Sequence, residues 1–162
     1  MRNSEWFPLE LKSTYGFYNW ENWDGIYTRW MQKKGGFTQR VRYPYLQFNL
    51  TFPPYPIEQF PNGIQLEIVM NGIHFDSIKS VSAEEKKCTY FLPDEVGENV
   101  EFSFHVNQTY NPAKYIMSRD DRELGVALSE FQYFKAISAE TKRDLYLLNK
   151  APATDKPSGG CL

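Results

Sequence analysis

The sequence predicts an all-β protein, an antiparallel β-sandwich of jelly-roll-like type with a short C-terminal helix or tail. Aromatic residues make up 17% of the 162 residues, and together with ten Pro and ten Gly they favour strands and turns over helices. Several segments alternate between apolar and polar residues with the period of two that a half-buried strand needs. Turn residues separate these segments at regular spacing, as in sandwiches and barrels. Unequal strand lengths and long irregular loops favour the sandwich over a closed barrel.

The N-terminal part predicts short strands around an aromatic stretch. Residues 6–11 form a short strand or an arm that lies across the fold. Asp24-Gly25 is a turn signal before a strand at 27–31. Gly35-Gly36 is interpreted as the next turn, and an alternating strand follows at 37–41.

The middle of the chain contains the clearest strands. Residues 45–52 and 64–70 each place apolar side chains on one face, and the prolines after residue 52 end the first of them. Asn71-Gly72 predicts a tight hairpin to a strand at 73–81, because both residues tolerate positive φ. Segments 87–92 and 100–106 read as another strand pair. The predicted core residues are Leu46, Phe48, Leu50, Ile64, Leu66, Ile68, Phe102 and Phe104.

The C-terminal part contains a long loop at 107–121 and a strand at 125–134. The apolar set of this strand changes phase between Leu128 and Phe131, which predicts a bulge. Ser138 is placed to cap a short helix that runs to Leu148. Residues 1–137 are therefore expected to form one β-sandwich domain, and residues 138–162 a short helix and a flexible tail, disordered from 151 onward.

Composition and charge exclude several classes of function. The net charge is -2, and no basic stripe marks a nucleic-acid-binding surface. No apolar run reaches the roughly 18 residues of a membrane span, and the first residues lack the apolar segment of a signal peptide. The two cysteines, Cys88 and Cys161, make no disulfide framework. We expect Cys88 to be a buried free thiol, which fits a reducing cytoplasm.

The motifs of common catalytic sites are missing from the sequence. It has no nucleophile elbow, no P-loop and no dinucleotide fingerprint, and its two histidines lack metal-ligand spacing. The carboxylates of Asp120, Asp121 and Glu123 form a loop cluster that can equally be solvated or paired with arginine. We therefore expect a protein that is not an enzyme and has no cofactor and no metal site, with calcium at these oxygens as the open alternative.

The most unusual stretch is 15–31, which holds three of the four tryptophans, with tyrosines, Asn, Asp and Arg among them. Flat rings beside hydrogen-bonding groups match a sugar, which has apolar C–H faces and a rim of hydroxyls. The candidate carbohydrate-binding residues are Tyr18, Trp20, Asn22, Trp23, Asp24 and Arg122, with Trp20 and Trp23 as stacking platforms. The alternative is that these rings cover the end of a small β core.

A second signal lies at 118–125, where two arginines stand among carboxylates before an apolar strand. Arginine binds a carboxylate with two parallel hydrogen bonds when the two side chains face each other. This segment is therefore expected to form bidentate ion pairs. They either brace the loop locally or reach the aromatic stretch, for example through Arg29 and Asp121.

Three motifs in this order resemble a β-sandwich module of bacterial sugar-polymer machinery. They are Gly16-Phe17-Tyr18 through Trp23-Asp24-Gly25, then Arg29-Trp30-Met31, then Asp120-Asp121-Arg122-Glu123-Leu124-Gly125-Val126-Ala127. Similar modules accompany glycosyltransferases of cell-surface polysaccharide synthesis. Comparable carbohydrate-binding sandwiches form the C-terminal domain of the ATPase subunit of some O-antigen ABC exporters. The resemblance covers about residues 14–134.

The resemblance implies a non-catalytic module, in which Trp30 and Leu124 belong to the core. Its ligand would be a bacterial surface polysaccharide, an O-antigen-like glycan of lipopolysaccharide, recognised during synthesis or export. The alternative is a protein-interaction or dimerisation domain of a glycosyltransferase or ABC exporter, which would be its partner through the parent protein. The expected location is cytoplasmic, at the inner-membrane face where the parent protein places it. The exposed rings and loosely attached ends also favour a homodimer.

Overall fold

The computed structural model describes residues 4–6, 14–41, 43–92, 99–147 and 158–162. Short helical segments are η1 (Ile57–Gln59), α1 (Pro112–Tyr115) and α2 (Ala139–Leu147). The strands are β1 (Ser4–Trp6), β2 (Tyr15–Phe17), β3 (Glu21–Trp23), β4 (Ile26–Arg40), β5 (Tyr45–Thr51), β6 (Ile64–Met70), β7 (Ile73–Ser80), β8 (Glu85–Phe91), β9 (Asn99–Val106), β10 (Ala127–Phe134) and β11 (Ser158–Cys161).

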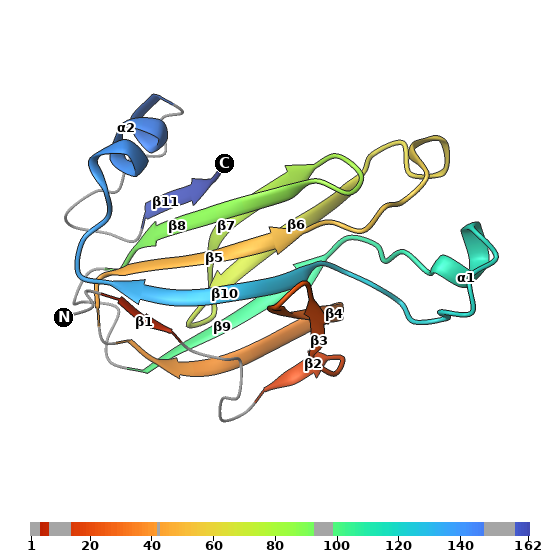
Figure 1. The fold of residues 1–162 in the computed structure, drawn as a ribbon, viewed down its shortest axis with the longest axis horizontal. Helices are drawn as coiled ribbons and strands as arrows, with labels where there is room; N and C mark the ends of the chain where they lie inside the picture. Colours follow the sequence, from red (N-terminus) through yellow and green to blue (C-terminus); the bar gives the residue numbers. More distant parts are fainter. Residues whose placement is uncertain (1–3, 7–13, 42, 93–98, 148–157) are drawn as a thin grey trace.

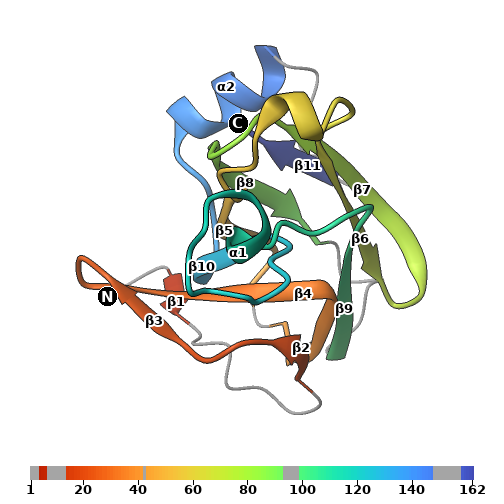
Figure 2. The same ribbon diagram turned by 90° about the vertical axis from the view of Figure 1, so that its right-hand side faces the viewer.

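All the described strands pair antiparallel, in the order β11-β8-β5-β10-β4-β9-β6-β7, with β1 on β10 and β2 and β3 on β4. The path curves into a nearly closed, barrel-like sheet around one core (Figures 1 and 2). The prediction of an all-β antiparallel fold is confirmed. The predicted pairing of segments 87–92 and 100–106 is wrong, because β8 pairs with β5 and β11, whereas β9 pairs with β4 and β6. The segments of η1 and α1 lie together at one end, and α2 lies at the other (Figure 1).

The 15-residue strand β4 belongs to both halves of the sheet. Its first residues pair with β3 and β10, and its last residues pair with β9. The predicted turn at Gly35-Gly36 is wrong, because both glycines lie inside β4 and are buried. Close packing requires glycine here, because a Cβ would lie 2.8 Å from the Met31 side chain at Gly35 and 2.6 Å from the carbonyl oxygen of Phe102 at Gly36. Gly16 on β2 is restricted in the same way, since a Cβ there would lie 2.0 Å from the carbonyl oxygen of Lys34.

The core combines aliphatic side chains with many aromatic rings, which come from strands on both sides of the barrel. The Phe48 and Phe131 rings stack at 4.8 Å, and the Phe37 ring meets Phe131 edge-on at 5.2 Å. Both are favourable geometries for paired rings. All eight residues predicted for the core are buried, and so are Trp30 and Leu124. The period-two pattern therefore identified the interior correctly.

Two local predictions for the C-terminal part are confirmed. The pairing of β10 with β5 shifts register between Ser129 and Gln132, and Glu130 has a positive φ of 51°, so the strand is bulged there. The Ser138 hydroxyl accepts a 3.1 Å hydrogen bond from the Thr141 amide, which caps α2. Among the described residues, no helix is long and apolar enough to cross a membrane.

The prediction that Cys88 is a free thiol is wrong, because Cys88 and Cys161 form a disulfide between β8 and β11. The expectation of a disordered tail is also wrong for residues 158–162, since Ser158–Cys161 pairs with β8. The remaining tail residues before 158 lie outside the described part of the chain, as do residues 7–11 of the predicted arm. The sequence did not reveal β11 because this strand has four residues, two of them glycine, and lacks the apolar alternation by which a strand is recognised.

Replacing Phe104 by Ala is expected to lower the free energy of unfolding by about 3 to 5 kcal/mol, because the cavity would remain partly unfilled. The Phe104 ring is fully buried and contacts the rings of Phe37 and Phe48 at 5.9 and 6.2 Å. Urea denaturation measures the change. Ser103→Ala, one residue earlier and facing away from the core, is the control and should change stability little. A loss below about 1 kcal/mol for Phe104→Ala would contradict this description of the core.

Candidate functional site

The aromatic stretch forms a hairpin in which β3 and β4 are joined by the predicted turn at Asp24-Gly25. Both residues have positive φ, 53° and 89°, as a type I′ turn requires. The Asn22 side-chain oxygen accepts a 2.6 Å hydrogen bond from the Gly25 amide and fixes the turn. Asp24 is exposed at the tip. Figure 2 shows this turn protruding from the body of the molecule. Asn22 and Asp24 therefore lie where a ligand could reach them.

The hairpin has two chemically different faces, and the two predicted stacking platforms lie on opposite ones. Register pairs Glu21 with Thr28 and Asn22 with Tyr27, so successive side chains alternate between the faces. Trp23 lies on the inner face, where its ring contacts the buried Trp30 ring at 5.6 Å. Trp20 lies on the outer face with Arg29, whose guanidinium is 5.3 Å from its ring centre. The two tryptophans therefore cannot stack on the same sugar unit.

The inner face connects the hairpin to the loop before β10 through Arg122. The Arg122 guanidinium binds Asp120 with two hydrogen bonds, from Nε at 2.9 Å and Nη2 at 2.8 Å, as the predicted bidentate pair. Its Nη1 donates to Glu21 at 3.0 Å, and the Trp23 indole nitrogen donates to the same carboxylate at 3.2 Å. Its carbon Cζ lies 5.2 Å from the Tyr18 ring centre. Tyr18, Trp23 and Arg122 thus meet around Glu21.

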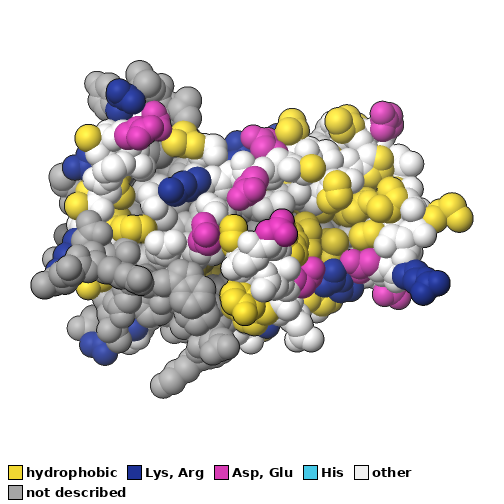
Figure 3. Space-filling view, in the orientation of Figure 1, with side chains coloured by type: hydrophobic (Ala, Val, Ile, Leu, Met, Phe, Trp, Pro, Cys, Tyr) yellow, Lys and Arg dark blue, Asp and Glu magenta, His cyan; other side chains and the backbone are white. Residues whose placement is uncertain are grey.

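These contacts keep the charges of the cluster fixed. Hydrogen bonds from Arg122 hold the pKa of the Asp120 carboxyl below its ordinary value, and the same pairing raises the pKa of Arg122. All three charged side chains are about two-thirds buried. Figure 3 shows basic and acidic side chains side by side on the lower right of one face, over this loop region. Arg122 therefore acts as a brace between two segments, and the predicted pairing of Arg29 with Asp121 does not form.

Glu123 organises the rest of the long loop. Its carboxylate accepts hydrogen bonds from Thr109 at 2.6 Å and Asn111 at 3.2 Å, which lower the pKa of Glu123 together with nearby Lys114. Its carbonyl oxygen accepts a 3.1 Å bond from the Tyr18 hydroxyl. The loop carboxylates Asp120 and Glu123 are consequently used in structural bonds.

The outer face carries the most exposed ring of the stretch, which the sequence did not single out. Tyr27 is 55% exposed, and its neighbour across the hairpin is Asn22. Arg29, two residues along, lies between the rings of Phe17 and Trp20 and donates from Nε to the Tyr18 carbonyl at 2.6 Å. The alternation of Tyr27 and Arg29 with buried Thr28 and Trp30 was the signal that could have identified this face. Tyr27, Asn22 and half-buried Trp20 form what we call the outer patch.

A separate polar cluster lies on the outside of the β6–β7 hairpin. His74 Nε2 lies 2.6 Å from Glu67 Oε2 and 2.9 Å from Ser77 Oγ, and the hydrogen bond from Ser77 lowers the pKa of Glu67. A catalytic triad needs the histidine between nucleophile and acid, with one ring nitrogen for each. Here one nitrogen faces both partners, and the serine binds the carboxylate directly. The cluster therefore resembles a surface hydrogen-bond network.

Comparisons with known proteins add no family to this description. No protein-family model matches the chain, and no curated protein shows significant similarity to it. Within the described residues, no group of three or more His, Cys, Asp or Glu side chains could hold a metal ion.

Replacing Arg122 by Ala is expected to lower the free energy of unfolding by about 1 kcal/mol at pH 7, the upper end for partly exposed ion pairs. Asp120 has a lowered pKa in the folded protein, so its pairing stabilises the fold above about pH 3.9 and is lost as pH falls through that lowered value. The difference between wild type and variant should therefore shrink below about pH 4.

Urea denaturation at pH 7, 4 and 3 measures this difference. Arg119→Ala, an exposed position on the same loop, is the control. A difference that is independent of pH, or equal to that of the control, would contradict the bracing role of Arg122.

Proposed function

We propose that the protein is a non-catalytic carbohydrate-binding module and that the outer patch of the β3–β4 hairpin contacts the sugar. The observation that carries this proposal is that exposed Tyr27 and half-buried Trp20 lie on the same face of the hairpin as exposed Asn22. Rings stack on the C–H faces of sugars, and an amide donates to hydroxyls. The Asn22 oxygen is bound to the turn, so its –NH₂ group is the part that serves the ligand. Asp24 supplies acceptors at the tip.

The original set of candidate residues divides between two roles under this proposal. Trp20, Asn22 and Asp24 contact the ligand, together with Tyr27. Tyr18, Trp23 and Arg122 hold the hairpin against the loop, because their polar atoms and faces are used in contacts within the chain.

The charges around the outer patch favour a neutral sugar. The Arg122 guanidinium is bound by both Asp120 and Glu21, and this inner cluster lies on the opposite face of the hairpin. Near the patch itself, Arg29 lies against the Trp20 ring and Asp24 is exposed at the tip, so charges of both signs are present. The proposed ligand is therefore a neutral segment of an O-antigen-like surface polysaccharide.

The parent machinery and the location are proposals that follow from the resemblance. A glycosyltransferase or an ABC exporter would bring the module to the growing or exported glycan, at the inner-membrane face. The cytoplasmic location was predicted from free thiols, and the Cys88–Cys161 disulfide removes that support. Disulfides persist in oxidising compartments, so a cytoplasmic module would have to tolerate reduction of this bond.

The second candidate function is a protein-interaction or dimerisation domain. The observation that favours it is exposed Ile26, which is 42% accessible at the start of β4 in a protruding hairpin. Register pairs Ile26 with Trp23, so its side chain lies on the face opposite Tyr27. Isoleucine offers a sugar little beyond contact area, whereas a partner that contacts both faces of the hairpin tip would cover Ile26 and Tyr27. The partner would be a second copy or the glycosyltransferase or exporter itself.

Trp20→Ala and Tyr27→Ala should each weaken binding to the recognised glycan by about tenfold or more, because burying most of a ring contributes about 1.5 to 3 kcal/mol. Tyr27→Ala should melt close to wild type, whereas Trp20→Ala should melt somewhat lower, because the Trp20 ring also packs against the core. Trp23→Ala should lower the melting temperature too, since its ring supports buried Trp30. Screening a glycan array of bacterial surface polysaccharides, followed by titration calorimetry at low and moderate salt, measures these effects. Affinity should change little with salt.

Ile26→Ser separates the two candidate functions. A carbohydrate module should keep its glycan affinity within a few-fold in this variant. An interaction domain should lose association, measured as a shift from dimer to the 19.0 kDa monomer in sedimentation. Normal glycan binding by both Trp20→Ala and Tyr27→Ala would contradict the proposed surface.

A further inference from the structure

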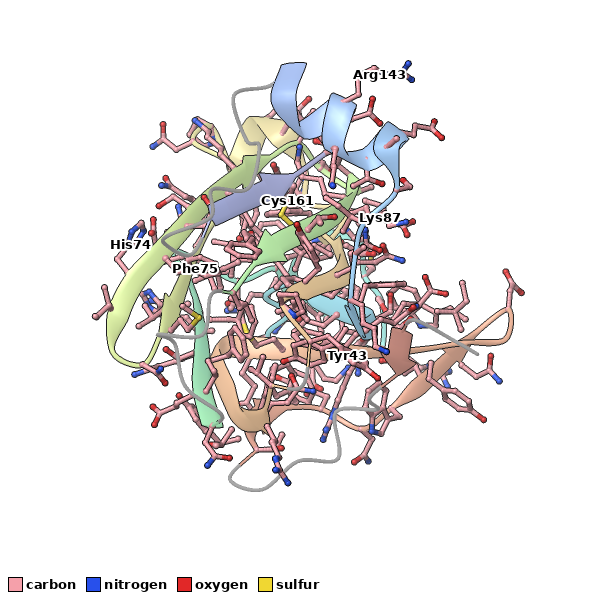
Figure 4. The ribbon with its side chains drawn as sticks, turned by 90° about the vertical axis from the view of Figure 1, so that its left-hand side faces the viewer. Tyr43, His74, Phe75, Lys87, Arg143 and Cys161 are labelled. Atoms are coloured by element: carbon pink, nitrogen blue, oxygen red, sulfur yellow. A yellow bond between two sulfur atoms is a disulfide. The ribbon has the colours of Figure 1, made fainter. Side chains whose placement is uncertain are left out.

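The C-terminal strand β11 covers the outer edge of β8 and lies beside the open seam of the barrel. Lys87 and Leu162 exchange two backbone hydrogen bonds, at 3.1 and 3.0 Å, and the pairing continues to Ser158 opposite Phe91. In Figure 4, Cys161 lies between β11 and β8, and Phe75 comes toward it from β7. The Tyr90 hydroxyl joins the two sides of the seam, 2.8 Å from Asp76 and 3.3 Å from the Cys161 sulfur. β11 thus closes the edge that the barrel itself leaves open.

Apart from the disulfide, β11 is weakly attached. Its four residues include two glycines, which lose the most conformational freedom on ordering and bury no side chain. Cys161 is its residue that packs against the core. A short ladder at an exposed edge is readily replaced by water, because backbone groups there bind solvent when the strand leaves. The covalent bond between Cys161 and Cys88 is therefore the main constraint that holds β11 in place.

The position of Gly159 shows that β11 fits this edge closely. Its φ is +126°, and a Cβ there would lie 2.1 Å from the Thr89 carbonyl oxygen. Any other residue at this position would push the strand away from β8. The pairing of β11 with β8 thus requires glycine at position 159, but it contributes little free energy without the disulfide.

We propose that the Cys88–Cys161 disulfide is a redox latch, whose reduction by a dithiol releases β11 and uncovers the edge of β8 while the barrel stays folded. Cys88 is fully buried, whereas Cys161 is partly exposed, so the Cys161 sulfur is the one a reductant reaches. The barrel keeps its fold because the Asp76–Tyr90 hydrogen bond and the Phe75–Tyr90 ring contact at 4.8 Å still join β7 to β8.

The reaction is ordinary thiol–disulfide exchange. A thiolate of the dithiol attacks the Cys161 sulfur and forms a mixed disulfide, and the S–S electron pair leaves on the Cys88 sulfur, which takes up a proton. The second thiol of the reductant then displaces Cys161 and closes a cyclic disulfide. The protein gains two electrons and two protons, and the dithiol loses the same.

Amide hydrogen exchange, measured for each residue by NMR, tests the latch. Strand β8 supplies its own control, because only alternate amides face β11. In an antiparallel strand, successive amides point to opposite neighbours. The amides of Lys87, Thr89 and Phe91 point toward β11, while those of Cys88 and Tyr90 point toward β5. Reduction of the full chain with dithiothreitol should speed exchange at Lys87, Thr89 and Phe91 by about tenfold or more, equivalent to about 1.4 kcal/mol. Cys88 and Tyr90 should keep their protection.

Two variants examine the same point without relying on the reductant alone. Cys161→Ser should show this alternating pattern in the absence of dithiothreitol and should not change when it is added. Gly159→Ala keeps both cysteines but loosens the strand, so dithiothreitol should reduce its disulfide faster than in wild type. Gly72→Ala is its matched control, because Gly72 also has positive φ, 79°, but open space around it.

Three results would overturn the proposal. The first is continued protection of Lys87, Thr89 and Phe91 after complete reduction, which would mean that β11 stays docked without the bond. The second is a loss of protection at all five amides, which would mean that the disulfide holds the barrel rather than the strand. The third is equal reduction rates for Gly159→Ala and Gly72→Ala.

Discussion

The continuity of β4 is the constraint on which the rest of the structure depends. One uninterrupted strand pairs with β10 and β3 at its start and with β9 at its end, so the two halves of the sheet must curve around a common core. Close approach at Gly36 and Gly16 makes this possible, because side chains there would collide with neighbouring backbone. The aromatic core fills the enclosed space, and the β3–β4 hairpin extends from the same strand. The candidate site is therefore an extension of the central structural element.

Arg122 converts that extension into a fixed surface. It binds Asp120 on its own loop and Glu21 on β3, and it stacks on Tyr18. With the inner face held in this way, the alternation of the strands directs Asn22 and Tyr27 outward together, and half-buried Trp20 lies on the same face beside Arg29. A ligand that stacks on preorganised rings loses less conformational entropy than one that must order them. The same geometry explains why residues with similar chemistry in the sequence, such as Trp20 and Trp23, take different roles.

The sequence predicted the parts of the fold that depend on local pattern. The alternation in 45–52 and 64–70 identified buried residues such as Phe48 and Ile68, and the phase change before Phe131 identified the bulge. The sequence also indicated that Arg122 would be a bidentate partner. Prediction from the sequence failed where a residue's role depends on contacts with distant chain segments. Gly35-Gly36 reads as a turn but serves close packing, and Cys161 reads as a mobile end but pairs with Cys88. The sequence also could not show which face of the hairpin each ring occupies, because this depends on the register between β3 and β4.

Under the proposed function, one face of the β3–β4 hairpin is structural and the other recognises the ligand. The indole N–H signals of the four tryptophans in an NMR spectrum test it most directly, recorded while adding the oligosaccharide that gives the strongest glycan-array signal. The signal of Trp20 should shift with increasing ligand. The signals of Trp23, whose indole donates to Glu21, and of buried Trp30 should stay in place. A shift of Trp23 with Trp20 unchanged would contradict the account, because the sugar would then occupy the face assigned to structure.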